Sequence, residues 1–233
     1  MINEKAARCH VENTSSGDEQ GRTTMAQLFD ITRTISPALA VWPGDALVTF
    51  HQELSLAAGD AVNLTTLSLS AHAGTHMDAP WHTEGLPVHP ADLPLEPFLG
   101  PARVISVGRR AGGITPADLD GHDLGGVQRI LLHTWYSDVP DERFDPAFPY
   151  PTPELIDWLA DQGAILLGLD VPSVDAFGGE GLTGHHRLFA RGLAVLENLV
   201  LCGVPDGEYE LIALPLKLAG VCGGPVRAIL RAL

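Results

Sequence analysis

The sequence has few basic residues and no long apolar run. Lys and Arg together number 14, against 29 Asp and Glu, which gives a formal net charge of −15. Binding to nucleic-acid phosphates requires a basic surface, so this composition argues against a nucleic-acid partner. No segment approaches the roughly 18 consecutive apolar residues that a membrane-spanning helix needs, so we expect no membrane partner either.

Cysteine is also scarce. The three cysteines, Cys9, Cys202 and Cys222, are too few and too scattered for a disulfide scaffold, and they lack the spacing of a cysteine-based zinc site. We therefore expect a protein of a reducing compartment, with a cytoplasmic location.

What the chain does contain is typical of a compact domain rich in turns. Hydrophobic residues make up 45%, charged residues 18%, and there are 25 Gly and 18 Pro. Residues 1–24 are polar and hold no apolar stretch of signal-peptide length, so we expect a disordered N-terminal tail there. Because no linker or internal repeat follows, residues 25–233 are predicted to form one domain.

Hydrophobic periodicity predicts a strand-rich α/β fold. Apolar residues alternate with polar ones over Leu47–Leu54 and Asn63–Ser70, which is the signature of half-buried strands. Further strands are expected at Ala102–Val107, Arg129–Thr134, Ala164–Val171, Leu193–Leu201, Glu210–Leu214 and Val226–Leu230.

Helices are expected to be few. Pro153–Gln162 carries the clearest signal, with Thr152 as N-cap, proline at the first helical position and Gly163 just past the end. The Ala164–Val171 strand follows directly, a helix-to-strand step typical of α/β proteins. Pro116–Leu119 and His185–Arg191 give weaker helical signals.

The most informative segment is SAHAGTHMDAPWHT, which places His72, His76, Asp78 and His82 within eleven residues. Its glycine and proline argue against a continuous helix. In a fully extended chain His72 and His76 would lie about 13 Å apart at roughly 3.3 Å per residue, too far to bind one ion. We therefore expect the backbone to bend between them, with Gly74 taking the required dihedral angles.

This set of side chains suits a divalent metal ion and hydrolysis. Two imidazoles and a carboxylate are ligands for Zn²⁺ or Mn²⁺, and an open coordination position would let the ion deliver hydroxide near neutral pH. The alternative is that these are ordinary loop or core histidines. A serine hydrolase is disfavoured, because the chain has no G-x-S-x-G motif.

A second cluster lies downstream, where His185 and His186 are followed by Glu197 inside an apolar strand. A buried carboxylate needs a charge partner, which is either a metal ion or an arginine such as Arg187 or Arg191. At most one of two adjacent histidines is expected to bind an ion, and the residues alone do not decide which.

Trp42, in the turn sequence VWPGD, has two interpretations. It is either a core side chain or an aromatic wall for a ligand, and residue chemistry alone favours the core.

The segment HAGTHMDAPWH resembles the H-x-G-T/A-H-x-D-x-P-x-H signature of the metal-dependent cyclase-like hydrolases. Within that family, the chain is similar to the bacterial kynurenine formamidases (arylformamidases). That similarity also covers the FDIT and WPGD opening, the HH…LENLVL stretch and the tail YELIALPLKLAG…PVRAILRAL. The resemblance implies a single cyclase-like domain of the swivelling β/β/α type with a mixed sheet.

The resemblance further implies a set of site residues and ligands. It implies two zinc ions per subunit, with Mn²⁺ as another candidate metal, and a homodimer that hydrolyses N-formyl-L-kynurenine by metal-activated hydroxide. His82 would act as general acid and base, and Trp42 would flank the aromatic substrate. The metal ligands would be His72, His76, Asp78, His185 and Glu197.

Two other functions remain open at this point. One is an isatin-hydrolase-like enzyme that opens a cyclic amide or a lactone with the same fold and metals. The other is a non-catalytic metal-binding module, which would have no need for an acid-base histidine such as His82 beside the ligands.

Overall fold

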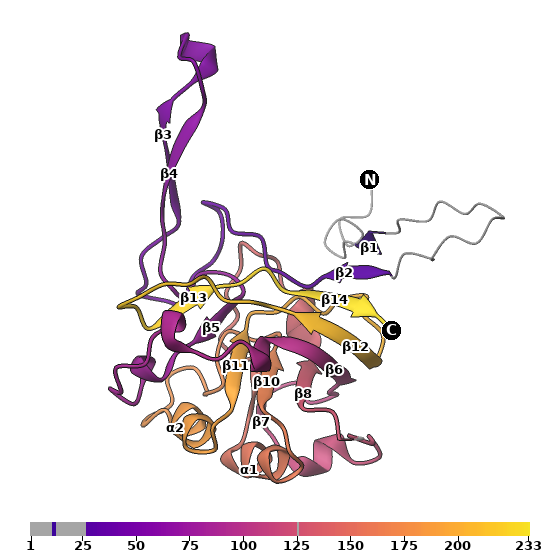
Figure 1. Cartoon of the computed structure of the whole chain (residues 1–233). Helices are drawn as coiled ribbons and strands as arrows, with labels where there is room; N and C mark the ends of the chain where they lie inside the picture. The colour runs from indigo at the N-terminus through magenta and orange to yellow at the C-terminus, as the bar shows by residue number, and fades with distance from the viewer. Residues whose placement is uncertain (1–10, 13–26, 125) are drawn as a thin grey trace, which may run out of the picture.

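The computed structural model describes residues 11–12, 27–124 and 126–233, which form a mixed ten-stranded sheet, two small two-stranded sheets and two α-helices (Figure 1). Their strands are β1 (Val11–Glu12), β2 (Leu28–Asp30), β3 (Thr49–Leu54), β4 (Leu64–Ser68), β5 (His76–Asp78), β6 (Leu99–Ser106), β7 (Gly112–Ile114), β8 (Arg129–His133), β9 (Pro149–Pro151), β10 (Leu166–Leu169), β11 (Ala194–Glu197), β12 (Gly207–Ile212), β13 (Gly223–Pro225) and β14 (Ile229–Ala232). The helices are α1 (Pro153–Asp161) and α2 (Thr183–Ala190).

The large sheet has the strand order β1-β2-β14-β12-β6-β8-β10-β11-β5-β13. Strands β6, β8, β10 and β11 are parallel to one another, whereas the strands on both sides join antiparallel. This order places the carboxyl end of β11 beside β5, with Glu197 opposite His76. Two of the predicted site residues, 121 positions apart in sequence, are therefore neighbours in the sheet.

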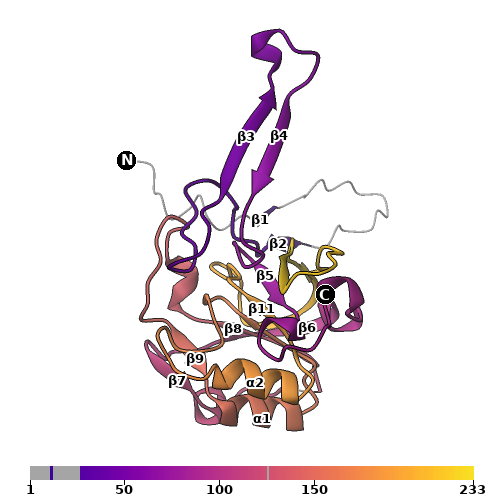
Figure 2. The same ribbon diagram turned by 90° about the vertical axis from the view of Figure 1, so that its left-hand side faces the viewer.

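Two apolar clusters lie on opposite faces of this sheet. Helices α1 and α2 cover one face (Figures 1 and 2), where Ile130 and Leu132 of β8 pack with Leu155 of α1. Leu131, between them on β8, belongs to the other cluster with Leu230 of β14, so the sheet curls to enclose a second core. The structure confirms the expected strand-rich α/β fold with a mixed sheet and few helices.

The helix predicted at Pro153–Gln162 is confirmed as α1. Thr152 is its N-cap, and its side-chain oxygen accepts a hydrogen bond from the backbone N–H of Leu155 at 3.2 Å. Gly163 follows with a φ of +90°, a conformation that glycine adopts without steric cost. The weaker signal at His185–Arg191 corresponds to α2, which begins two residues earlier, at Thr183.

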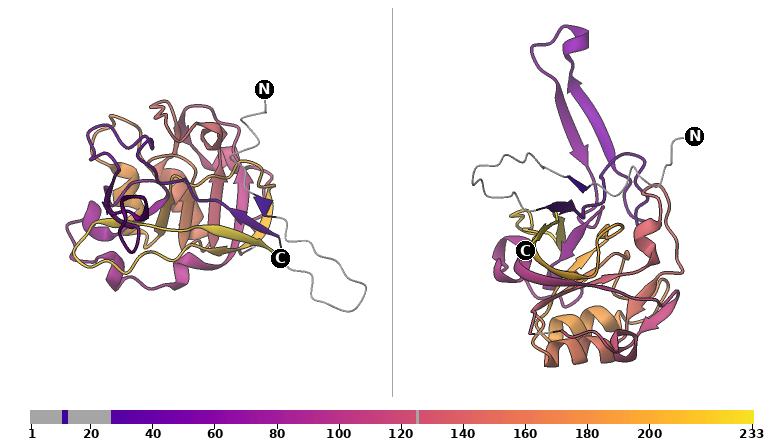
Figure 3. Two further views of the ribbon diagram at one scale, coloured as in Figure 1. Left: turned by 90° about the horizontal axis from the view of Figure 1, so that it is seen from above. Right: turned by 90° about the vertical axis from the view of Figure 1, so that its right-hand side faces the viewer.

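Strands β3 and β4 form a hairpin that projects far from the body of the molecule (Figures 1, 2 and 3). Strands were predicted at both places, but the prediction that they are half-buried is wrong, because every residue of both strands is exposed. Alternation of apolar and polar residues indicates two distinct faces, but burial requires another layer. Among the described residues no layer covers this hairpin.

The predicted tail, residues 1–24, lies outside the described residues except for Val11 and Glu12, which pair with β2. None of the described helices is long and apolar enough to cross a membrane.

Candidate metal centre

The site is built on β5, a short strand between β11 and β13 that carries His76 and Asp78. The turn before it bends as expected, since Gly74 has a φ of +69° and a Cβ at that position would lie 2.9 Å from the Ile35 side chain. This bend brings His72, which precedes the strand, back over it. His72 Nδ1 lies 2.8 Å from Asp78 Oδ1.

His185 reaches the same place from helix α2. The Asp175 carboxylate holds the first turn of this helix by accepting hydrogen bonds from the backbone N–H groups of Gly184 and His185. Its Oδ2 also lies 2.6 Å from His185 Nδ1. The other ring nitrogen, Nε2, is thereby directed at Asp78, whose Oδ2 lies 3.3 Å away.

Glu197, at the end of β11, completes the cluster. Its Oε2 lies 3.4 Å from His76 Nε2, and its Oε1 lies 3.8 Å from His185 Nε2. Of the two partners that the sequence left open, the arginines lie elsewhere. Both Arg187 and Arg191 pair with Asp157 of α1.

The structure also separates the two adjacent histidines. His185 is buried in the cluster, whereas His186 is exposed and pairs with Glu84. His72, His76, Asp78, His185 and Glu197 are therefore brought together as the sequence predicts.

The polar atoms at the centre of this cluster fit a divalent cation. Asp78 is 2% exposed, and ring nitrogens of His72, His76 and His185 lie 2.8 to 3.5 Å from its carboxylate oxygens. Among the described residues, no contact to these oxygens or to His76 Nε2 has the angles of a proper hydrogen bond. A buried carboxylate needs a compensating positive charge, which either protonated imidazole rings or a divalent cation can supply. The ligand atoms of His72, His76 and Asp78 lie within 4.8 Å of one another, the arrangement that binding to a single ion requires.

The pKa values of the buried histidines also indicate a site that favours positive charge. Burial alone would lower the pKa of His72, but the adjacent Asp78 carboxylate and Cys222 sulfur outweigh it and raise that pKa to about 11. Burial also opposes a positive charge on His76 and His185, but nearby carboxylates outweigh it. Asp78 helps to raise the pKa of His76 to about 9, and Asp175 and Asp78 raise the pKa of His185 to about 10. The carboxylates thus favour positive charge in this cluster, and a divalent cation supplies it.

Cation binding is expected to tighten as the pH rises and to release protons. The raised pKa values mean that the three rings hold protons near neutral pH in the polypeptide alone, and a cation must displace them. The stabilisation of the metal-free fold by these ion pairs is complete below the ordinary histidine pKa of 6.5 and is lost as the pH rises through about 9 to 11. Zinc affinity measured by chelator competition at about pH 6 and about pH 8 checks the first expectation. An affinity unchanged between these conditions would contradict it.

His82 stands at the edge of the cluster, in the 3-10 turn Pro80–His82. Its ring centre lies 4.3 Å from that of His72 and 5.4 Å from that of His185. The His82 ring is exposed at the cavity, but the protein around it displaces part of its solvent. This partial desolvation and the charged rings nearby lower the pKa of His82 to about 4, although the charge of Asp78 opposes the shift. A cation at Asp78 keeps positive charge beside His82, so we expect the direction of this shift to persist when metal is bound.

The cluster opens into a cavity of about 320 Å³. Its lining includes His72, His82 and His185, together with the aromatic side chains of Trp42 and Phe144. Both positions proposed for Trp42 from the sequence apply. It packs against the core cluster, with its ring centre 5.5 Å from that of Phe144, and it also borders the cavity.

The sequence did not identify three other residues of the site. Asp175 holds His185, Cys222 lies beside His72, and Asn198 lines the cavity with a φ of +57°, unusual for a residue other than glycine. No local motif marks them. Their positions near predicted ligands were the only indication in the sequence: Asp175 lies ten residues before His185, and Asn198 directly follows Glu197.

Comparison with known proteins agrees with this geometry. The family model named Cyclase matches residues 29–176. Kynurenine formamidase of Salinibacter ruber (strain DSM 13855 / M31) is 44% identical over 205 residues, which cover 88% of this chain and 97% of the relative.

Two solved structures share the fold. Isatin hydrolase A from Labrenzia aggregata, bound to benzyl benzoate, has a TM-score of 0.75 at 27% identity and covers 88% of this chain and 93% of its own. A protein described as a "potential metal-dependent hydrolase with cyclase activity" has a TM-score of 0.74 at 26% identity, with 88% and 96% covered. Together with the histidine and carboxylate cluster, these similarities indicate a metal cofactor. The chain therefore belongs to the Cyclase family and is a relative of the kynurenine formamidases.

Proposed function

We propose that this protein is a metal-dependent arylformamidase that hydrolyses N-formyl-L-kynurenine to L-kynurenine and formate. The observation that carries the proposal is the buried Asp78 carboxylate, which three histidine rings surround within 3.5 Å beside a cavity that Trp42 and Phe144 help to line. The 44% identity to a kynurenine formamidase supports the choice of substrate. The proposed cofactor is two zinc ions, with Mn²⁺ as the other candidate, bound by His72, His76, Asp78, His185 and Glu197.

The cavity suits a flat aromatic substrate with a small reacting group. Its volume of about 320 Å³ is at the lower end of the range for small-molecule sites. Trp42 and Phe144 offer aromatic faces for the anilide ring, while His82 borders the same space. A formyl group is small enough to reach the cluster while the ring rests against these side chains.

Hydrolysis requires that a water oxygen bonds to the formyl carbon, that the carbon–nitrogen bond breaks and that a proton reaches the aniline nitrogen. When bound, divalent cations supply Lewis-acid activation of the water and of the formyl oxygen. The chain itself moves the proton. His82 is neutral near pH 7 because its pKa is lowered, so a ring nitrogen accepts the water's proton and returns it to the departing nitrogen.

A second enzymatic function is the opening of a cyclic amide or lactone. It is favoured by the TM-score of 0.75 to an isatin hydrolase. Both reactions attack an amide-type or ester carbonyl next to the same cluster, and they differ in whether the leaving group stays attached to the product.

Metal analysis combined with parallel turnover assays on N-formyl-L-kynurenine and isatin tests these functions. We expect the purified protein to contain a divalent metal, to prefer the formamide, and to lose activity with a chelator and regain it with added zinc. A preference for isatin would support the second function. Bound metal with no turnover of either compound would contradict the arylformamidase and favour the non-catalytic metal-binding module.

The proposed assembly is a homodimer, and the projecting β3–β4 hairpin supports it. An isolated two-stranded hairpin is marginally stable in water, yet this one exposes several large apolar side chains. They are Phe50, Leu54, Leu56, Val62, Leu64 and Leu67. A second copy of the chain would cover them, and sedimentation analysis of the purified protein tests this.

A further inference from the structure

Each histidine that faces Asp78 has one ring nitrogen directed at the carboxylates and the other at an outer partner. For His76 the outer nitrogen, Nδ1, lies 2.9 Å from the carbonyl oxygen of Gly74. For His185 it lies 2.6 Å from the Asp175 carboxylate. Such outer partners fix the ring orientation and the position of the ring proton in histidines that bind metals.

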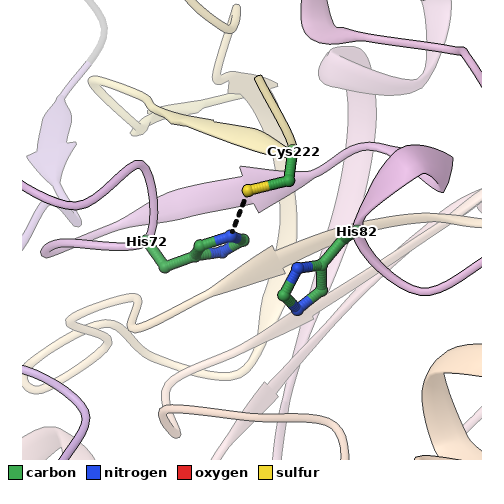
Figure 4. Close-up of side chains that lie close together, drawn as sticks. All are labelled: His72, His82 and Cys222. Atoms are coloured by element: carbon green, nitrogen blue, oxygen red, sulfur yellow. Dashed lines mark hydrogen bonds between the residues drawn. The ribbon is translucent and has the colours of Figure 1, made fainter. Parts of the chain in front are cut away.

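The outer partner of His72 is a sulfur atom. His72 Nε2 lies 3.1 Å from Cys222 Sγ, the contact marked by the dashed line in Figure 4. The opposite ring nitrogen, Nδ1, lies 2.8 Å from Asp78 Oδ1. When Nδ1 faces a cation it carries no proton, so the proton resides on Nε2, which then donates a hydrogen bond to the sulfur.

Backbone contacts with β5 place Cys222 next to His72. Cys222 directly precedes β13, and its carbonyl oxygen accepts a hydrogen bond from the N–H of Ala79 at 2.9 Å, next to β5. Gly223 pairs with Asp78, and a Cβ at Gly223 would lie 2.7 Å from the Met77 carbonyl oxygen and 2.9 Å from the His72 ring. Only glycine at 223 permits this approach, so the sheet places the backbone of Cys222 close enough for its sulfur to contact His72.

We propose that Cys222 is a positioning residue for the cation site: its sulfur accepts a hydrogen bond from His72 Nε2–H and so holds Nδ1 toward Asp78. This inference rests on the proposed cation site. A direct ligand role is the alternative, since His72, His82 and Cys222 offer three ligand atoms within 4.8 Å of one another. Within this cluster, however, the buried atoms without a proper hydrogen bond belong to Asp78 and His76, and Asp78 lies on the Nδ1 side of the His72 ring.

Zinc affinity of the purified full chain, measured by chelator competition, tests the proposal. We expect Cys222→Ala to lower the affinity about 10- to 100-fold, the usual effect of losing an outer partner of a metal ligand. Cys222→Ser keeps a hydrogen-bond acceptor and is expected to lose less. Val221→Ala, which shortens the neighbouring side chain and leaves the sulfur, is the matched control and is expected to bind zinc as the unaltered protein does.

Cobalt loading gives a readout that a general loss of structure would not produce. A thiolate bound directly to Co²⁺ shows charge-transfer absorption in the near ultraviolet, and we expect none from the unaltered protein. Such a band, lost in Cys222→Ala, would overturn the proposal by making Cys222 a ligand. Equal zinc affinities of the alanine variant and the unaltered protein would overturn it by removing any role. If the alanine variant does not fold, the zinc affinity of the serine variant and the cobalt spectrum of the unaltered protein decide whether Cys222 positions His72. An unaltered protein that binds neither zinc nor cobalt would refute the cation site itself.

Discussion

Replacing Asp78 by asparagine is expected to weaken cation binding strongly and to reduce hydrolysis roughly a thousandfold or more, since Lewis-acid activation contributes several kcal/mol and each 1.36 kcal/mol is a factor of ten. The Asp78 carboxylate approaches three histidine rings within 3.5 Å. Asparagine retains the shape of the side chain but carries no charge to balance a cation. The variant is therefore expected to fold and to bind metal weakly.

Metal content by mass spectrometry and turnover of N-formyl-L-kynurenine measure this effect. The histidines give an independent readout: without the Asp78 charge, burial is expected to bring the pKa of His72 down from about 11, which nuclear magnetic resonance titration detects. Glu208→Gln, which removes an exposed charge paired with Arg103, is the control and is expected to change neither quantity. Full metal content in the Asp78 variant would contradict the proposed site.

The second large effect is expected at His82. Replacement by alanine is expected to reduce turnover about 10²- to 10⁴-fold, the usual contribution of a general acid-base residue, while metal content stays nearly unchanged. His82 is exposed, its pKa is lowered to about 4, and it borders the cavity beside Trp42. The neutral ring is therefore available as a base near neutral pH, and this form is lost as the pH falls toward 4.

Metal content separates the two roles open to His82. A ligand atom of His82 also lies within 4.8 Å of those of Asp78 and His185, so loss of metal from the alanine variant would reassign His82 as a ligand. Added imidazole is expected to restore part of the activity if the lost function is proton transfer. His186→Ala changes an exposed histidine next to His185 and serves as the control, with activity expected to stay near that of the unaltered protein.

Local chemistry explains which elements were predictable. Helix α1 has its own N-cap, first-turn proline and terminal glycine, so nearby residues determine where it begins and ends. Strands β5 and β13 have three residues each and no periodic pattern of their own, and they form because neighbouring strands supply their hydrogen bonds. The β3–β4 hairpin shows the opposite case, because its alternation predicted strands correctly but carried no information on whether another layer covers them.

By itself, the sequence determined the kinds of ligand and their local spacing: the histidines and aspartate around Gly74, the bend between them, and the strand-rich fold. The tertiary structure decided which distant groups join them. The resemblance of the sequence already implied His185 and Glu197 as ligands, but only the tertiary structure gave the physical reason. It placed Glu197 opposite His76 through the pairing of β11 with β5, directed His185 rather than His186 at Asp78, and brought Cys222 to His72. The physical reason is that bends and caps depend on neighbours along the chain, whereas these contacts depend on strand order and on one helix held by Asp175.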